Sequence, residues 1–365
     1  MQVFHYLAVH DGHALPGSEP WSPELSYNPR HCGLKRRSSS EAAADMNTLD
    51  NDSSRRGETA GAVKLCIGVC TRHRPSTLAR LLQSLRRMDI PPAVDVTLCV
   101  VENDHEPRSR ELVETGTAGA RFITHYQLEP RIGIPQARNR LLDAALDRAC
   151  AALIFIDDDE EVAPDWLCAL ERFARETEWQ SVIQGRVVTR MPEGASEILA
   201  PFFQRKERAT GDALSLCATN NTLLPLEPVR RHGLRFDERR TTEGGEDSIF
   251  FGRVRQVGTP LVFCREAVVI ETVPRERANL WWLCRRKFRV GLLMGSGSIA
   301  GKQRSLGKVL YYAVKALGHM LQSAVYILLF QRERSARALL NACRCLGYSL
   351  GYFQIKTQPY RQVEG

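Results

Sequence analysis

The sequence predicts an α/β fold with a mostly parallel central sheet, followed by a helical C-terminal segment. Three kinds of observation support this prediction: apolar runs of strand length, amphipathic helical stretches between them, and a polar segment after each run. The runs are residues 63–69, 95–101 and 152–156. Strands that alternate with helices imply right-handed crossovers and parallel pairing. With 365 residues and 43% apolar content, the chain can bury a large core.

Two helices are predicted between the strand runs. In the first, apolar residues recur with the i, i+3, i+4, i+7 spacing of a helix that buries one face. They are Leu78, Leu81, Leu82 and Leu85. Ser76 and Thr77 precede them and are residue types that cap helix N-termini. The second helix is predicted to begin near Pro135, with Ala137, Leu141, Leu142 and Ala145 on its apolar side.

The chain divides into three regions. Residues 1–61 are rich in Ser, Asp, Arg, Pro and Ala without a sustained period, which predicts a disordered N-terminal extension. Met46 begins a polar lead into the first strand, and we expect it to be the true start. Residues 1–9 lack the basic lead of a signal peptide, so none is expected. Residues 62–290 should form the main domain, and residues 291–365 an amphipathic and hydrophobic helical region.

The cysteines and the net charge indicate the cell compartment and the kind of partner. Eleven scattered cysteines without a Cys-x-x-Cys pair predict reduced thiols in a cytosolic protein and no structural zinc. The formal net charge is +8, and residues 265–308 hold ten Lys or Arg against three Glu. This basic block is interleaved with apolar residues and carries no recognised nucleic-acid motif. We therefore expect an anionic membrane surface as a partner and no nucleic acid.

The most distinctive stretch is the acidic run "IFIDDDEE" at residues 154–161, directly after a predicted strand. Asp157 and Asp159 have the Asp-x-Asp spacing that can hold Mg2+ or Mn2+ through oxygen ligands while leaving positions open for phosphate. The alternative is a solvated acidic turn that caps the next helix. Because the polar segments after parallel strands meet at one sheet edge, we expect residues 71–75, 102–104 and 157–160 to line one cleft.

Two further segments carry candidate chemistry. Arg138 and Asn139 lie near the start of a predicted helix, where free N–H groups and a guanidinium favour phosphate; an ordinary exposed arginine is the alternative. Glu246 and Asp247 follow a glycine pair at the start of another predicted helix. A carboxylate there can remove a proton from an attacking hydroxyl, or simply stabilise the helix dipole.

With these segments identified, the chain resembles a family 2 glycosyltransferase of the GT-A fold over residues 62–290. The motifs "CTRHRP", "GIPQARN", "FIDDDE" and "GGEDSIFF" occur in the family's order. The runs "NDHEP" and "VIETVPRERANLWWLCRRKFRVG" are similar to the bacterial exopolysaccharide subgroup, which includes glucosyltransferases that extend succinoglycan repeat units.

The resemblance implies roles on the donor side. Thr71, Arg72 and Pro75 match the loop that flanks the nucleotide. Glu102 matches the position where relatives carry an aspartate that recognises uracil, and Asp104 lies nearby.

Arg138 and Asn139 match an element near the base and phosphates. In the acidic run, Asp159 matches the favoured ligand of Mg2+ or Mn2+. Asp157 matches the outer acid that faces the ribose and also serves the metal, and Asp158 between them belongs to the nucleotide-sugar site.

On the acceptor side, Glu246 and Asp247 match the acidic pair that supplies the general base, and we assign the base to Asp247. Many relatives carry a His as a further ligand after the last core strand; this chain has Glu271 in that region.

The resemblance implies an inverting, metal-dependent hexosyltransferase that moves glucose from a UDP-sugar donor to a polyprenyl diphosphate-linked saccharide. Two alternatives stay open. A sugar-nucleotide pyrophosphorylase would need a Gly-rich loop after the first strand, and residues 71–75 contain no Gly. A non-catalytic, nucleotide-binding membrane scaffold would bind nucleotide without turnover.

The C-terminal region predicts peripheral or monotopic attachment to a membrane, which the resemblance implies is the cytoplasmic face of a bacterial inner membrane. Residues 278–291 mix two tryptophans with four cations, which suits a headgroup layer. Residues 309–330 are strongly apolar but carry Lys315, so we expect a helix in the interface rather than across it. Residues 338–353 are expected to pair with it as a hairpin; buried intramolecular helices are the alternative.

Overall fold

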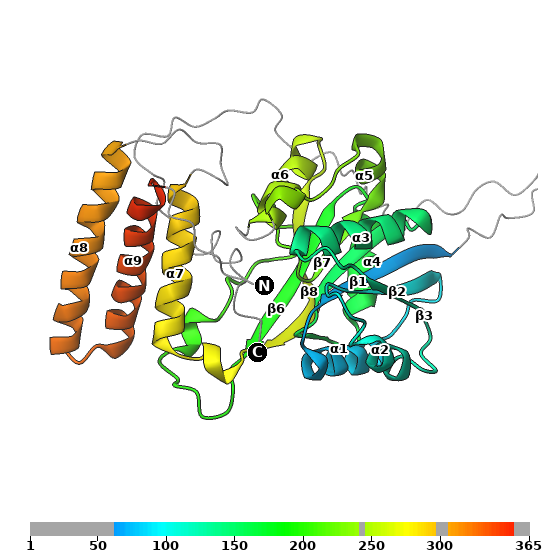
Figure 1. Ribbon diagram of the computed structural model, residues 1–365, viewed down its shortest axis with the longest axis horizontal. Helices are drawn as coiled ribbons and strands as arrows, with labels where there is room; N and C mark the ends of the chain where they lie inside the picture. Colours follow the sequence, from blue (N-terminus) through cyan, green and yellow to red (C-terminus); the bar gives the residue numbers. More distant parts are fainter. Residues whose placement is uncertain (1–61, 241–244, 297–305, 354–365) are drawn as a thin grey trace, which may run out of the picture. The chain divides into compact units, whose positions relative to one another are not determined.

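A computed structural model describes residues 62–240, 245–296 and 306–353 (Figure 1). The predicted N-terminal extension and the start at Met46 lie outside these residues. The strands are β1 Val63–Thr71, β2 Val94–Glu102, β3 Ile123–Leu128, β4 Ala152–Asp157, β5 Glu160–Val162, β6 Val182–Arg190, β7 Thr222–Pro225 and β8 Leu261–Thr272. The α-helices are α1 Pro75–Arg87, α2 Arg110–Gly116, α3 Ile134–Asp147, α4 Trp166–Glu176, α5 Leu226–His232, α6 Glu246–Gln256, α7 Leu280–Gly295, α8 Leu306–Leu328 and α9 Arg332–Gly351. Short 3-10 helices are η2 Ala200–Phe202, η3 Glu238–Arg240 and η4 Arg275–Arg277.

The eight strands form one mixed sheet in the order β3-β2-β1-β4-β7-β6-β8-β5. Pairing is parallel for β1 with β2 and β4, for β2 with β3, and for β6 with β8. It is antiparallel where β7 joins β4 to β6 and where β5 joins β8. The prediction of a GT-A α/β fold with a mostly parallel sheet is confirmed, and the antiparallel pairs are additions to it.

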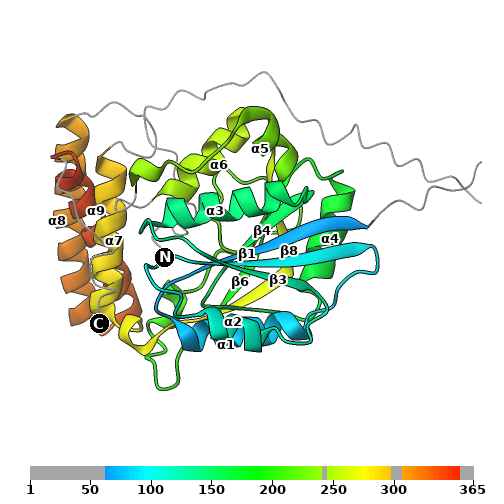
Figure 2. The same ribbon diagram turned by 45° about the vertical axis from the view of Figure 1, so that its right-hand side comes forward.

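Helices cover both faces of this sheet (Figures 1 and 2). On one face α1, α2 and α4 pack on the odd-numbered side chains of β1, which include Leu65 and Ile67. On the other face α3, α5 and α6 pack on the even-numbered ones, such as Cys66. The central strands are therefore largely apolar on both sides, as expected for a parallel sheet covered by helices, and β1, β2 and β4 end on the polar residues Thr71, Glu102 and Asp157.

The helix starts differ from the predicted capping. Helix α1 begins at Pro75, and Arg74 occupies the N-cap without a side-chain cap, so the prediction of a cap from Ser76 or Thr77 is wrong. Proline suits the first helical position because it has no N–H to satisfy and its φ angle is already helical. Thr77 lies within the first turn, where its hydroxyl donates to the Arg74 carbonyl at 3.1 Å.

The C-terminal helices pack against one another, with α9 between α7 and α8 (Figure 2). Gly291 of α7 lies against the backbone of Arg344, and Gly347 of α9 lies against the backbone of Phe288; a Cβ at either glycine would come within 2.1 Å of a carbonyl oxygen. Small residues thus allow the two helices to approach closely. None of the helices in residues 62–240, 245–296 and 306–353 has the length and apolarity needed to cross a membrane.

Candidate active site

The ends of three neighbouring strands bring the predicted polar segments together. In the register of the sheet, Thr71 at the end of β1 pairs with Glu102 at the end of β2. Cys70 pairs with Asp157 at the end of β4. The first, second and fourth strands therefore end at one edge, and the polar residues that follow them are neighbours in space, as predicted.

The acidic run is buried. Asp157, Asp158 and Asp159 are 5%, 2% and 8% exposed, and Glu160 is fully buried. The alternative of a solvated acidic turn is therefore wrong. The predicted capping of α4 is also absent, because Asp165, the N-cap residue of α4, makes no side-chain cap hydrogen bond. Buried carboxylates are costly unless they are paired or bind a cation, so their partners decide what this cluster can do.

One side of the run is held by the loop after β1. The Thr71 hydroxyl donates to Asp158 Oδ2 at 2.8 Å. The Arg74 guanidinium donates to Asp158 Oδ1 at 3.0 Å and to Asp159 Oδ2 at 3.3 Å. Asp158 is therefore engaged by its own chain at both oxygens, and burial raises its pKa although Arg74 opposes that shift.

The charge on Asp157 and Asp159 is not fully compensated. Burial, and then the neighbouring Asp159, raise the pKa of Asp157 to about 7. Asp159 Oδ1 is buried without a hydrogen-bond partner among the described residues. Two neighbouring carboxylates, one of them with an unpartnered oxygen, fit a hard divalent cation, since Mg2+ is commonly held by one or two carboxylates together with phosphate oxygens and water. Within the described ranges no group of three His, Cys, Asp or Glu residues forms a site made by protein alone.

Glu160, the last buried acid of the run, lies opposite Glu271 in the sheet. Glu160 accepts from the Asp157 N–H at 3.0 Å and from the Asn220 amide at 3.0 Å, and burial holds its pKa well above the usual value. β5 and β8 pair Glu160 with Glu271. Glu271 accepts from Arg205 Nη2 at 2.7 Å. Its charge is thus already paired with an arginine.

Glu102 and Asp104, at and just after the end of β2, accept hydrogen bonds from nearby loop residues. Glu102 is fully buried and accepts from the Ser109 N–H and hydroxyl, each at 2.8 Å, and from the Tyr126 hydroxyl at 2.5 Å. Asp104 accepts from His105 N–H at 2.7 Å, and its other oxygen contacts His73. Glu102 therefore fixes the loop that follows β2, and Asp104 is the acid of this pair that contacts the loop after β1.

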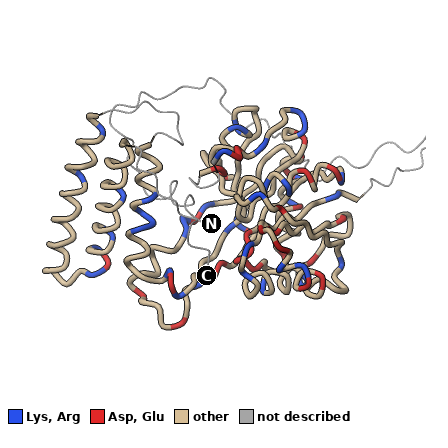
Figure 3. The backbone as a smooth tube through the Cα atoms, in the orientation of Figure 1, with Lys and Arg blue, Asp and Glu red and all other residues tan. Residues whose placement is uncertain are grey.

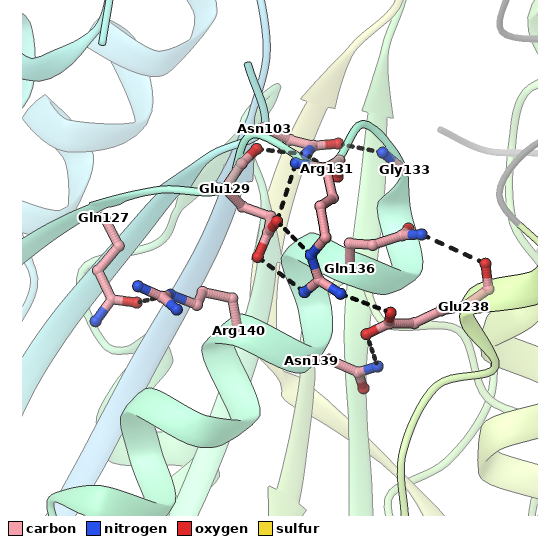
Figure 4. A network of polar contacts seen from close by, with 9 residues as sticks. All are labelled: Asn103, Gln127, Glu129, Arg131, Gly133, Gln136, Asn139, Arg140 and Glu238. Carbon is pink, nitrogen blue, oxygen red and sulfur yellow. Dashed lines mark hydrogen bonds and ion pairs between the residues drawn. The ribbon is translucent and has the colours of Figure 1, made fainter. Parts of the chain in front are cut away.

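Asn103, between those acids, organises the loop before α3 (Figure 4). Its amide nitrogen donates to the carbonyls of Glu129 and Arg131, both at 2.9 Å, and its oxygen accepts from the Gly133 N–H at 2.7 Å. Hydrogen bonds from Asn103 therefore hold the start of the "GIPQARN" motif at the end of β2.

Asn139 of α3 forms hydrogen bonds with the segment that precedes α6. Its side chain donates to the Phe236 carbonyl and to Glu238, each at 3.0 Å, and accepts from the Phe236 N–H at 2.9 Å. Arg131 also contacts Glu238 at 2.9 Å, and Figure 4 shows these side chains converging on Glu238 from α3 and its preceding loop. The Asn139 side chain is thus committed to positioning other segments.

Arg138 joins the two acidic segments. It is 2% exposed, so the alternative of an ordinary exposed arginine is wrong. Its Nη1 donates to Glu246 Oε1 at 2.7 Å, and its guanidinium lies 5.6 Å from the centre of the Phe236 ring. The charges of Glu246, Asp247 and Asp157 all favour its cationic form. One buried guanidinium therefore lies within electrostatic reach of both the acidic run and the acidic pair.

Asp247, the second acid of this pair, is buried at a helix start. It is 7% exposed at the N-terminus of α6, after Gly245, whose φ of 82° suits glycine. Burial, and then the neighbouring Glu246, raise the pKa of Asp247 to about 7. A carboxylate with a pKa near neutrality is suited to act as a general base at physiological pH.

Comparisons with known proteins agree with this architecture. The model of the family described as glycosyl transferase family 2 matches residues 66–233. The succinoglycan biosynthesis protein ExoM of Rhizobium meliloti (strain 1021) is 34% identical over 309 residues, which cover 81% of this chain and 96% of that protein. The chain belongs to glycosyl transferase family 2. Membership favours sugar transfer over the pyrophosphorylase alternative.

Solved structures of S. aureus TarS are more distant from this glycosyltransferase. One is 15% identical with a TM-score of 0.47, covering 82% of this chain and 56% of TarS. A structure of TarS residues 1–349 in complex with UDP-GlcNAc is 13% identical with a TM-score of 0.46, covering 80% and 92%. Both scores are below 0.5, and the assignment to the family does not depend on them.

Two site residues of the glycosyltransferase were given no individual role from the sequence, although Arg74 lies in the segment 71–75 that was expected to line the cleft. Arg74 pairs with Asp158 and Asp159, and its place within the "CTRHRP" motif is a signal that could have identified it. Arg205 pairs with Glu271 from an irregular segment that has no distinguishing pattern. Of the predicted residues on the first loop, Pro75 starts α1, and Arg72 has its Nε buried without a hydrogen-bond partner among the described residues.

The Arg138 to Glu246 ion pair generates a stability prediction. Arg138→Met should lower the free energy of unfolding by about 3 to 5 kcal/mol, because it leaves a buried carboxylate without its cation. Arg138→Met combined with Glu246→Gln should recover more than half of that loss. The measurement is denaturant unfolding of both variants and wild type, and equal losses for the single and double variants would contradict the pairing.

Proposed function

We propose that this glycosyltransferase transfers glucose from a UDP-sugar to a polyprenyl diphosphate-linked saccharide, with inversion, in bacterial exopolysaccharide biosynthesis. The similarity to ExoM, a succinoglycan biosynthesis protein, supports the biosynthetic role. The observation that carries the chemistry is the buried guanidinium of Arg138, which is paired with Glu246 and lies within electrostatic reach of Asp247 and Asp157. It supports a single site in which the proton-accepting Asp247 lies near the acids proposed to bind the UDP-sugar.

Asp247 is the proposed base. The acceptor hydroxyl attacks the anomeric carbon from the face opposite the nucleotide, its proton passes to the Asp247 carboxylate, and the bond from the anomeric carbon to the diphosphate oxygen breaks. A single displacement of this kind inverts the configuration. The raised pKa makes Asp247 a stronger base than an exposed aspartate. Arg138 holds Glu246 in place through its 2.7 Å contact, beside the aspartate whose pKa Glu246 helps to raise.

The acidic run is the proposed donor side. Thr71 and Arg74 hold Asp158, so the carboxylates on either side of it are kept at the strand end. Asp159, with its unpartnered buried oxygen, and Asp157 would hold Mg2+ or Mn2+, and Asp157 would face the ribose. Such a cation supplies charge neutralisation for the diphosphate of the leaving nucleotide. The paired Glu271 orients Arg205 beside these acids.

We expect sugar transfer to rise with pH up to about 7 and then level off. Below pH 7 Asp247 is increasingly protonated and cannot accept the hydroxyl proton, so the rate should fall about tenfold per pH unit, given its pKa of about 7. Asp247→Asn should lower transfer by about 10² to 10⁴ fold and remove this limb of the profile. The assay is a panel of nucleotide sugars with Mn2+ and a membrane extract.

Asp143→Asn is the matched control, since this α3 carboxylate is half exposed and its ion pair among the described residues is with Arg235. It should transfer sugar at the wild-type rate. Wild-type transfer by Asp247→Asn would refute the base assignment. UDP binding by wild type without any sugar transfer would support the scaffold alternative instead.

We expect UDP binding to depend on the cation and on Asp159. In calorimetry, wild type should bind UDP at least tenfold more tightly with Mn2+ than with EDTA, because two carboxylates and the diphosphate share the ion. Asp159→Asn should abolish most of that difference, whereas Asp143→Asn should keep it. Equal UDP affinity for wild type with and without Mn2+ would count against a metal at this site.

We further propose that α8 lies on the cytoplasmic face of the bacterial inner membrane. Only Ala316 and Ser323 of this helix are buried. It packs on α9 through Ser323, whose hydroxyl lies 3.0 Å from that of Ser335. Its exposed apolar side chains are Leu306, Leu310, Tyr311, Val314, Leu317, Met320, Leu321, Val325, Ile327 and Leu328.

Charge complementarity favours an anionic lipid surface for this face. Lys and Arg are few along α8 but recur on α7 (Figure 3). Those on α7 are Arg285, Arg286, Lys287 and Arg289. An exposed apolar stripe on one helix, in a three-helix group that also contains a basic helix, is the pattern of attachment to an anionic interface. Such attachment would bring the enzyme to a lipid-linked acceptor.

Flotation with lipid vesicles tests the attachment. Wild type should float with phosphatidylglycerol vesicles and much less with phosphatidylcholine vesicles. Leu317→Asp with Leu321→Asp, at positions that are 62% and 70% exposed, should remain in the pellet fraction because charged groups resist entry into the interface. Arg231→Gln, an exposed change on α5, is the control. Flotation of the double variant at the wild-type level would contradict the proposal.

A further inference from the structure

A cavity that Ser248, the residue after Asp247, helps to line is not assigned by the chemistry above. It lies between β6, β8 and the segments 204–208 and 214–218, and Ser248 of α6 contributes to its wall. Its lining includes apolar residues from two segments, Leu214 and Cys217 from one and Phe263 from β8. The cavity therefore combines an apolar wall with access to the start of α6.

The cavity has an excess of positive charge. The lining cations are Arg186, Arg205, Lys206 and Arg208, and the lining acid is Glu207. Arg186 pairs with Glu207 at 2.5 Å, which accounts for one cation. Arg208 makes no ion pair within the described ranges, so positive charge is left for a ligand.

Arg205 presents one edge that is not used by the protein. Its Nη2 donates to Glu271, whereas its Nη1 is buried and has no hydrogen-bond partner in the described part of the chain. Leaving a buried donor unpaired is costly, and an anion in the cavity would satisfy it. Guanidinium groups with free edges are typical binding groups for phosphate and carboxylate.

The cavity also adjoins the proposed base. Ser248 lines it and directly follows Asp247. Cys217, in the cavity wall, lies within electrostatic reach of both Asp247 and Arg208: after burial, Asp247 raises the pKa of its thiol and Arg208 lowers it. A molecule in the cavity that contacts Arg208 is therefore close to the group that would remove its proton.

We propose that this cavity is the acceptor subsite and that Arg208 and the free edge of Arg205 bind an anionic group of the acceptor. The inference rests on the proposed function and deepens it by naming the acceptor's chemistry. The anion is either the lipid-bound diphosphate or a carboxylate on the saccharide, since both fit a guanidinium pair. The apolar wall formed by Leu214 and Phe263 contacts the sugar face.

The test is transfer kinetics with the full chain, UDP-sugar and increasing amounts of lipid-linked acceptor from a membrane extract. Arg208→Gln should raise the half-saturating acceptor amount about tenfold, the effect of losing one charge-assisted contact, and leave the half-saturating donor concentration unchanged. Arg231→Gln, which alters an exposed α5 arginine paired with Glu227, should match wild type in both.

Two probes distinguish the sources of the anion. Competition by farnesyl diphosphate against acceptor, weakened in Arg208→Gln, would identify the diphosphate, and the same result with glucuronate would identify a carboxylate. An unchanged half-saturating acceptor amount in Arg208→Gln would overturn the inference while leaving the proposed function intact. Absence of transfer by wild type with every donor would refute the proposed function, and the inference with it.

Discussion

The site depends on burying more negative charge than one segment can neutralise. Four consecutive acids from Asp157 to Glu160 are at most 8% exposed at the end of β4. Cations from three separate segments act on them: Arg74 after β1 pairs with Asp158, and the charges of Arg138 on α3 and Arg205 before β7 lower the pKa of Asp157 and Glu160 against the effect of burial. Because a buried carboxylate is stable only with a partner, these segments must meet at this strand end, and the arrangement of the loops follows from that requirement.

Compensation is incomplete at two positions, and these are the positions suited to chemistry. Asp157 and Asp247 each have a pKa raised to about 7, in both cases by burial first and then by a neighbouring acid. The acids with full sets of partners, such as Glu102, fix the backbone instead. The same low-dielectric environment therefore separates positioning groups from groups that can exchange a proton or bind a cation.

Elements defined by local sequence pattern could be predicted, whereas elements defined by pairing between distant segments could not. The central parallel strands and helices α1 and α3 could be predicted because each has its own apolar period. β5 has three residues and β7 four, and β8 carries Arg265 and Glu266 in its interior. Such strands are defined by distant pairing partners, so local pattern alone did not reveal them or their antiparallel connections.

By itself, the sequence determined the parallel core, the acids at the strand ends and the family motifs, because these are local in the chain. Only the tertiary structure decided how the charges pair. Arg138 and Glu246 are 108 residues apart, and Glu271 faces Glu160 through the register of β5 with β8. Partner choice in a buried cluster depends on distance and desolvation in three dimensions, which residue spacing along the chain does not encode.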